Sequence, residues 1–136
     1  MNNKFWILIL LSLTLLGCNE EINWENLKEI YLFKKKPLDF ETKKYNELIK
    51  LPDAKSLITD VVKKRLVNSK FKGKKSNCKW KGSSYYGITL FNDGKIIKLK
   101  MSSNYGIYQN MNTGKCYSIE GFETLGLMNW EELIKD

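Results

Sequence analysis

Two serine–lysine pairs have the spacing of a catalytic nucleophile and its base. The pattern Ser-x-x-Lys occurs at residues 69–72 and again at 76–79. A lysine at this spacing can activate the serine hydroxyl for attack on a carbonyl carbon. Both pairs lie in a lysine-rich stretch, where the pattern is expected by chance. The chain lacks the companion triplets Ser-Asp-Asn and Lys-Thr-Gly. We therefore predict no serine nucleophile.

Acid–base and metal chemistry also lack a suitable set of residues. The chain has no histidine, the residue that most often exchanges protons near neutral pH. The carboxylates that could act in pairs are Asp60, Asp93, Glu120 and Glu123. Asp93 belongs to an expected turn, and the other three are expected on exposed helices or loops. We predict that the protein is not an enzyme, with no catalytic residue, metal or cofactor.

The most distinctive charged segment is 61–92, which contains no acidic residue. Its basic residues are Lys63, Lys64, Arg65, Lys70, Lys72, Lys74, Lys75, Lys79 and Lys81. Aromatic residues, Trp80 among them, are interleaved with these lysines. Such a segment can attract an anionic partner, and in a cytosolic protein it would indicate nucleic acid. The alternative is a solvated loop that balances the acidic residues near both ends of the chain.

The first 18 residues indicate an export signal. Lys4 precedes the apolar run Phe5–Leu16, and Gly17 comes directly before Cys18. The run has 12 residues, so as a helix it would span about 18 Å, well short of a hydrocarbon core of about 30 Å. The sequence Leu-Leu-Gly-Cys at 15–18 resembles the lipobox of bacterial lipoprotein precursors. An uncut membrane anchor is the alternative.

The resemblance to lipoprotein precursors implies that residues 1–17 are removed and that Cys18 is lipidated. The protein would then lie in the cell envelope, anchored to a membrane. Asn19 follows the cysteine in place of the aspartate that commonly retains lipoproteins at the inner membrane of Gram-negative cells. We therefore expect the outer membrane, facing the periplasm, or the outer face of the cytoplasmic membrane in other hosts. In that compartment the available partners are acidic proteins and anionic envelope polymers, and no nucleic acid.

Export also bears on the two remaining cysteines, Cys78 and Cys116. In an oxidising compartment an even pair of cysteines indicates a disulfide. Metal binding is the alternative, although two cysteines without histidine make a poor site. Residues 18–23 would form the lipidated cysteine and a short tether, and residues 24–136 a single domain.

Helical patterns are expected at both ends of this domain. Apolar residues on one face predict a helix at 24–31, a second from Asp39 to Leu51, and a third from Asp53 to Leu66. Asn129 and Glu132 match a capping box, which predicts a final helix.

Strand patterns occupy the region between these helices. Residues 85–91 and 95–101 flank a turn that we centre on Asp93 and Gly94. This turn pairs Leu90 with Ile97, Ile88 with Leu99 and Tyr86 with Met101, which places Lys98, Lys100, Thr89 and Gly87 on the opposite face. Two shorter strands are expected near 107–109 and 115–119.

These elements predict an α+β fold, with a small antiparallel sheet of about four strands, three to four helices and one disulfide. The function we expect is that of a non-catalytic envelope lipoprotein that binds a protein partner, as immunity and inhibitor proteins do. The alternatives are a structural or polyanion-binding lipoprotein and a phage superinfection-exclusion lipoprotein. The residues expected to bind the partner are Lys70, Lys72, Lys74, Lys75, Lys79, Trp80 and Lys81.

Overall fold

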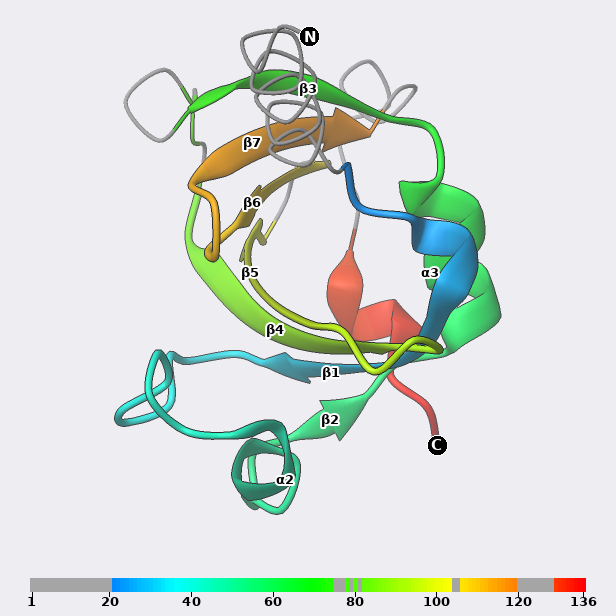
Figure 1. Ribbon diagram of the computed structural model, residues 1–136. Coiled ribbons are helices and arrows are strands. Elements are labelled where there is room, and N and C mark those ends of the chain that lie inside the picture. Colours follow the sequence, from blue (N-terminus) through cyan, green and yellow to red (C-terminus); the bar gives the residue numbers. More distant parts are fainter. Residues whose placement is uncertain (1–20, 75–77, 79, 81, 104–105, 120–128) are drawn as a thin grey trace, which may run out of the picture.

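A single antiparallel sheet dominates the structure. The computed structural model describes residues 21–74, 78, 80, 82–103, 106–119 and 129–136. Its elements are η2 (Trp24–Asn26), β1 (Leu27–Phe33), α2 (Tyr45–Leu48), β2 (Lys55–Ser56), α3 (Thr59–Leu66), β3 (Ser69–Lys74), β4 (Ser84–Phe91), β5 (Ile96–Ser102), β6 (Ile107–Asn110), β7 (Lys115–Ile119) and η4 (Trp130–Leu133). The strand order is β2-β1-β4-β5-β6-β7-β3. The sheet curls strongly, and η4 lies inside the curve (Figure 1).

The main hydrophobic core fills the inner face of the sheet. Trp130 of η4 is fully buried there, and its indole Nε1 donates a hydrogen bond to the carbonyl oxygen of Ser102 at 3.0 Å. Trp24 of η2 donates in the same way to the hydroxyl of Tyr108, also at 3.0 Å. Val62 and Leu66 of α3 complete this cluster. Both tryptophans bury a large apolar ring while their polar atoms stay paired, which favours burial of the whole side chain.

A second hydrophobic cluster covers part of the outer face. Its buried members are Phe33, Phe40, Tyr45, Leu48 and Ile88. The segment between β1 and β2, including α2, supplies three of them and lies against β1 and β4. Sheet strands that are buried on both faces carry apolar residues at consecutive positions rather than at alternate ones.

The predicted fold class is wrong. The sheet has seven strands rather than about four, and the described residues contain only two α-helices, of 4 and 8 residues, rather than three or four. The predicted C-terminal helix is the 3-10 helix η4. There the Asn129 side chain accepts from the backbone N–H of Glu131 at 3.1 Å.

The predicted helix at 24–31 is a short 3-10 turn followed by strand β1. Ile30 and Leu32 face the inner core, whereas Tyr31 and Phe33 pack with the outer cluster. The apolar run at 30–33 therefore places side chains in the hydrophobic clusters on both faces of the sheet. A short apolar run of this kind does not distinguish a helix from a doubly buried strand.

The two following helices are shorter than predicted. Asp39 has a φ of 54°, so it stands in a left-handed turn rather than at a helix start, and α2 covers only Tyr45–Leu48. Before α3, the chain at 55–56 pairs with β1 and Leu57 forms a bridge with Ile134. Because strand pairing occupies these residues, α3 begins at Thr59 rather than after Asp53.

The predicted hairpin exists as β4 and β5, but its register is wrong by one residue. Ile88 pairs with Lys98, Thr89 with Ile97 and Gly87 with Leu99. The N–H of Gly94 bonds to the carbonyl of Phe91, and the N–H of Phe91 bonds to the carbonyl of Lys95, both at 2.9 Å. Gly94 has a φ of +85°. These contacts define a three-residue loop ending in a left-handed glycine, whereas we had predicted a two-residue turn.

The predicted strands at 107–109 and 115–119 are confirmed as β6 and β7. The Cys78–Cys116 disulfide is also confirmed, with its Cα atoms 5.9 Å apart.

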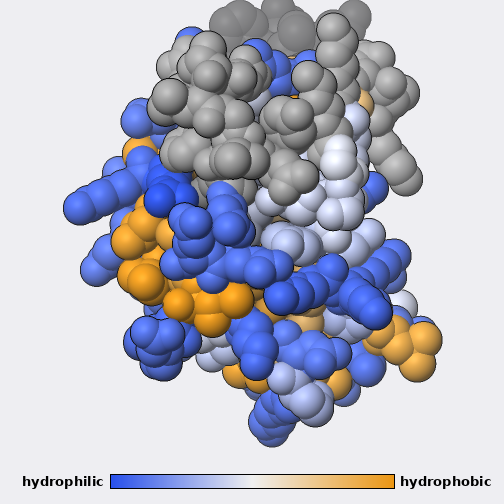
Figure 2. All heavy atoms as spheres, turned by 180° about the vertical axis from the view of Figure 1, so that it is seen from behind, coloured by the Kyte–Doolittle hydropathy of each residue, from blue (hydrophilic) through white to orange (hydrophobic). Residues whose placement is uncertain are grey.

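Over the part of the chain that the structure describes, no helix is both long and apolar enough to span a bilayer. On the face shown in Figure 2, hydrophilic side chains (blue) surround the hydrophobic areas (orange).

Candidate partner-binding surface

Part of the basic segment at 61–92 forms strand β3 (Ser69–Lys74), so these residues are not in the solvated loop that was the alternative. β3 lies at one end of the strand order and pairs with β7. Lys70, Lys72 and Lys74 are exposed on it. Lys75, Lys79 and Lys81 lie outside the described residues. The structure therefore places three of the predicted lysines on one ordered edge strand.

A β-bulge decides which β3 side chains share a face. Phe71 pairs with Tyr117, and Lys74 pairs with Lys115. The register shifts between Phe71 and Gly73, where Gly73 has a φ of 141°. In a regular strand, residues three apart point to opposite faces. The extra residue of the bulge brings Phe71 and Lys74 to the same face, beside Lys115.

Phe71 is an exposed aromatic residue on a fixed support. Its side chain is 52 % exposed. Its ring meets Tyr117 edge to face at 5.9 Å, and Tyr117 stacks on Tyr108 at 5.3 Å. Tyr108 in turn contacts Trp24 at 5.7 Å, inside the core. Because this row of rings is anchored in the core, Phe71 loses little conformational freedom when a partner covers it.

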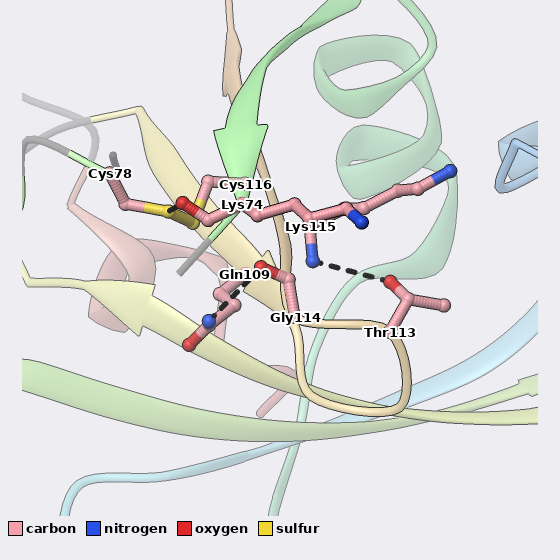
Figure 3. Close-up of a disulfide and its surroundings, with 7 residues drawn as sticks. All are labelled: Lys74, Cys78, Gln109, Thr113, Gly114, Lys115 and Cys116. Atoms are coloured by element: carbon pink, nitrogen blue, oxygen red, sulfur yellow. Dashed lines mark hydrogen bonds between the residues drawn. A yellow bond between two sulfur atoms is a disulfide. The ribbon is translucent and has the colours of Figure 1, made fainter. Parts of the chain in front are cut away.

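Two lysines lie directly opposite each other next to Phe71. Lys74 and Lys115 are register partners on neighbouring strands and lie beside the disulfide (Figure 3). The Lys115 Nζ is 5.9 Å from the centroid of the Phe71 ring. Like charges at directly opposed positions destabilise a sheet. We call Phe71, Lys74 and Lys115 the Phe71 surface.

The disulfide fixes the chain next to this surface. Cys116 directly follows Lys115, and the Cys78 Sγ lies 3.3 Å from the carbonyl oxygen of Lys74. On the adjoining turn, Gln109 donates to the carbonyl of Gly114 at 3.3 Å (Figure 3). The covalent bond therefore ties the end of β3 to β7, which holds the two lysine backbones in their opposed register.

Trp80 lies on the other face of the sheet. The Nζ of Lys100 is 4.9 Å from its ring centroid, and the ring is half-buried. Lys100 and Cys116 both pair with Gln109. Lys100, Gln109 and Cys116 therefore share one face of the sheet, the face opposite to that of Phe71. The indole Nε1 of Trp80 is buried without a hydrogen-bond partner among the described residues. Trp80 therefore lies apart from the Phe71 surface. That Trp80 binds the partner stays a prediction.

Sequence reasoning counted Phe71 among the aromatic residues of the basic segment but placed neither Phe71 nor Lys115 in the partner-binding set. The alternation Lys70-Phe71-Lys72 was a possible strand signal, but it is short and continues into a glycine. Lys115 belongs to a predicted strand, and its position opposite Lys74 depends on a pairing between segments about 40 residues apart. Local pattern does not reveal such a pairing.

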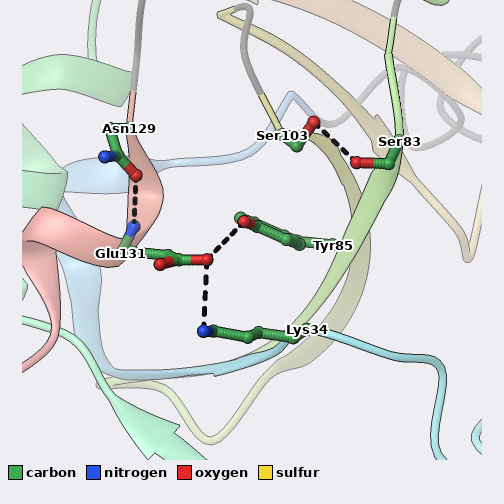
Figure 4. Close-up of polar contacts among 6 residues, drawn as sticks. All are labelled: Lys34, Ser83, Tyr85, Ser103, Asn129 and Glu131. Atoms are coloured by element: carbon green, nitrogen blue, oxygen red, sulfur yellow. Dashed lines mark hydrogen bonds and ion pairs between the residues drawn. The ribbon is translucent and has the colours of Figure 1, made fainter.

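A second polar group joins η4 to the sheet. The Tyr85 hydroxyl donates to Glu131 at 2.6 Å, and the Lys34 ammonium lies 3.3 Å from the same carboxylate (Figure 4). The hydrogen bond to Glu131, together with burial, raises the pKa of Tyr85 to about 12. The hydrogen bonds from Tyr85 and Lys34 lower the pKa of Glu131. This group keeps its tyrosine neutral and its carboxylate charged at neutral pH, which suits a structural clamp.

Metal binding finds no support in the described part of the chain, where no three histidine, cysteine, aspartate or glutamate residues come together as possible ligands. Comparison of the chain with protein-family models, with curated proteins and with solved structures gives no match.

Proposed function

We propose that this protein is a lipid-anchored, non-catalytic binding protein of the cell envelope, of the immunity or inhibitor type. It binds an acidic protein partner through the Phe71 surface. One observation carries the proposal: an exposed aromatic ring on a rigid support lies on the same face as two directly opposed lysines.

Each part of the Phe71 surface gains from a partner. Covering the exposed half of the Phe71 ring removes apolar area from water, and aromatic residues are frequent among binding hot spots. An acidic group placed between Lys74 and Lys115 would replace their mutual repulsion by two attractive contacts. The formal net charge is +8 for the whole sequence and +7 without Lys4, which the predicted cleavage removes, and it favours approach of an acidic partner over long distances.

The lipid anchor rests on Cys18, which lies outside the described residues. Substitution of Cys18 by serine should abolish acyl labelling and leave an uncleaved or soluble form. Continued uptake of labelled fatty acid by that variant would contradict the anchor. Only residues 19–23 separate Cys18 from η2, so at full extension the tether reaches about 18 Å. The anchored domain would act close to a membrane surface.

Charge reversal tests the proposed binding surface. Envelope proteins captured by the wild type should be lost with the double variant Lys74→Glu and Lys115→Glu. The matched control is Lys50→Glu with Lys64→Glu, which changes the net charge equally at two exposed lysines away from the Phe71 surface. Association with an identified partner should slow at higher salt for the wild type and the control only. Capture of the same partners by both double variants would refute the role of this surface.

A stability measurement separates a binding role from a structural one. Lys74→Gln removes the like-charge pair, so we expect the free energy of unfolding to rise by roughly 0.2–1 kcal/mol while partner binding weakens. Lys50→Gln should change neither quantity. Loss of stability in Lys74→Gln would show instead that this lysine supports the fold.

Immunity itself is tested in the host cell. A strain that lacks the protein should become sensitive to a secreted toxin, and the wild-type protein should restore resistance. The Phe71→Ala variant should fold, because its ring is half-exposed, and should fail to restore resistance. Full protection by Phe71→Ala would exclude the proposed surface.

A further inference from the structure

We propose a second, separate binding site, a lysine-lined groove that takes an anion carrying two or more phosphate groups. The groove has a volume of about 570 Å³ and is lined by Lys34, Lys35, Asp53, Lys55, Ile134 and Lys135. In strand order it lies at the β2 end of the sheet, whereas the Phe71 surface lies at the β3 end. It is not part of the proposed partner-binding surface.

Three separate segments build this groove. Lys34 and Lys35 follow the end of β1, Lys55 belongs to β2, and Lys135 comes from the C-terminal segment. Backbone hydrogen bonds hold the third segment against the second: Lys135 N–H donates to Ser56 at 2.7 Å. Lysines from three distant parts of the sequence therefore meet on a backbone frame that is fixed before any ligand arrives.

The charges in the groove are strongly unequal. Its lining contains four lysines and one carboxylate, Asp53. Lys34 is already paired with Glu131, its Nζ 3.3 Å from that carboxylate, so the attraction for a ligand rests on Lys35, Lys55 and Lys135. Lys36, which pairs with Glu41, is not part of the lining. A concave site lined by one sign of charge concentrates the field and attracts ions of the opposite sign.

The type and spread of the cations indicate the class of anion. Lysine acts as a compact point charge and is a frequent phosphate ligand. Lys35, Lys55 and Lys135 supply three such charges from separate segments, which suits an anion whose charge is spread over more than one phosphate group, and the groove is large enough for it. Ile134 packs against the main core and adds an apolar wall, which suits the carbon frame of a phosphorylated compound.

Titration of the intact protein with pyrophosphate tests the groove. We expect pyrophosphate to bind more tightly than inorganic phosphate, and Lys35→Gln with Lys55→Gln to weaken pyrophosphate binding about tenfold, as expected for loss of two exposed ion pairs. Both residues are exposed, so the variant should fold. The control Lys50→Gln with Lys64→Gln removes the same net charge elsewhere and should bind as the wild type does.

Vesicles distinguish a lipid headgroup from a soluble phosphate compound. If the source is a lipid, the Lys35 and Lys55 variant should bind less to vesicles that contain phosphatidic acid, and both proteins should ignore phosphatidylcholine. Pyrophosphate binding without this vesicle effect indicates a soluble ligand. The Lys74→Glu and Lys115→Glu variant should keep pyrophosphate binding, which separates this site from the Phe71 surface. Equal weakening in the control, or no pyrophosphate binding at low salt, would overturn the proposal.

Discussion

Ile88 on β4 tests whether the sheet is covered on both faces. Its side chain is fully buried in the outer cluster with Phe33 and Phe40. Truncating a buried isoleucine to alanine removes apolar contacts and leaves a cavity, at a cost of about 2–5 kcal/mol. The outer layer is a connecting segment that can partly close over the gap. We therefore expect Ile88→Ala to lose about 2–3 kcal/mol, near the lower end of that range.

The loss should be visible in both urea and thermal unfolding. For a domain of this size each kcal/mol shifts the melting temperature by about 4 °C, so the expected drop is roughly 8–13 °C. Ile96→Ala is the matched control, because Ile96 lies on the outer face of β5 and is 37 % exposed. It should change stability by no more than about 0.5 kcal/mol. If Ile88→Ala is equally mild, the outer face is open and the observed register is wrong.

Three further predictions concern polar contacts and the disulfide. Tyr108→Phe leaves the indole N–H of Trp24 without its acceptor, so unfolding by urea should show a loss of roughly 1–3 kcal/mol, and an unchanged midpoint would contradict that contact. The pKa of Glu131 is lowered in the folded protein, so its contribution to stability is present above the unfolded value of 4.5 and is lost as pH falls through the folded pKa. The wild type should lose stability in acid more steeply than Glu131→Gln, and parallel pH profiles would count against the clamp. Reduction of the disulfide opens a loop with a sequence separation of 38 and should lower stability by up to about 4 kcal/mol, which differential scanning calorimetry with and without reductant would measure.

The sequence predicted the positions of the strands in the middle of the sheet, although not the hairpin register, because the turns carry strong local signals. Gly94 and Gly114 both adopt positive φ, which the turn after β4 and the turn after β6 require. The alternating residues on either side then give strands of nearly the predicted length. The disulfide followed from export and an even pair of cysteines rather than from geometry.

The hairpin register failed because both of its faces are apolar. We chose the pairing that gathers Ile88, Leu90 and Ile97 on one face, which assumes one buried face and one exposed face. In the structure Ile88 lies under the outer layer and Thr89 lies in the inner core, where its hydroxyl donates to the carbonyl of Ile97 at 2.9 Å. Once both faces are covered, hydrophobic pattern no longer selects a register, and the turn geometry decides it.

The first helix failed for a related reason. The residues at 27–33 fit either one face of a helix or a strand that is buried on both faces. Which of the two forms depends on pairing with β4, about 60 residues away. β3 was missed because lysine is common there and apolar residues are few. It pairs with β7, and that contact comes from tertiary structure rather than from the propensity of the segment itself.

The lysines of β3 have one explanation that needs no partner: charged side chains on an edge strand discourage pairing with other chains. This explanation suits exposed lysines in general, but it does not account for the Phe71 surface. An exposed aromatic ring makes an edge more adhesive rather than less. Lys74 and Lys115 oppose each other within the sheet, so their repulsion weakens the protein's own strand pairing. Because the exposed ring and the opposed lysines would both gain from a bound partner, these three residues, rather than the whole basic segment, define the surface on which binding should depend.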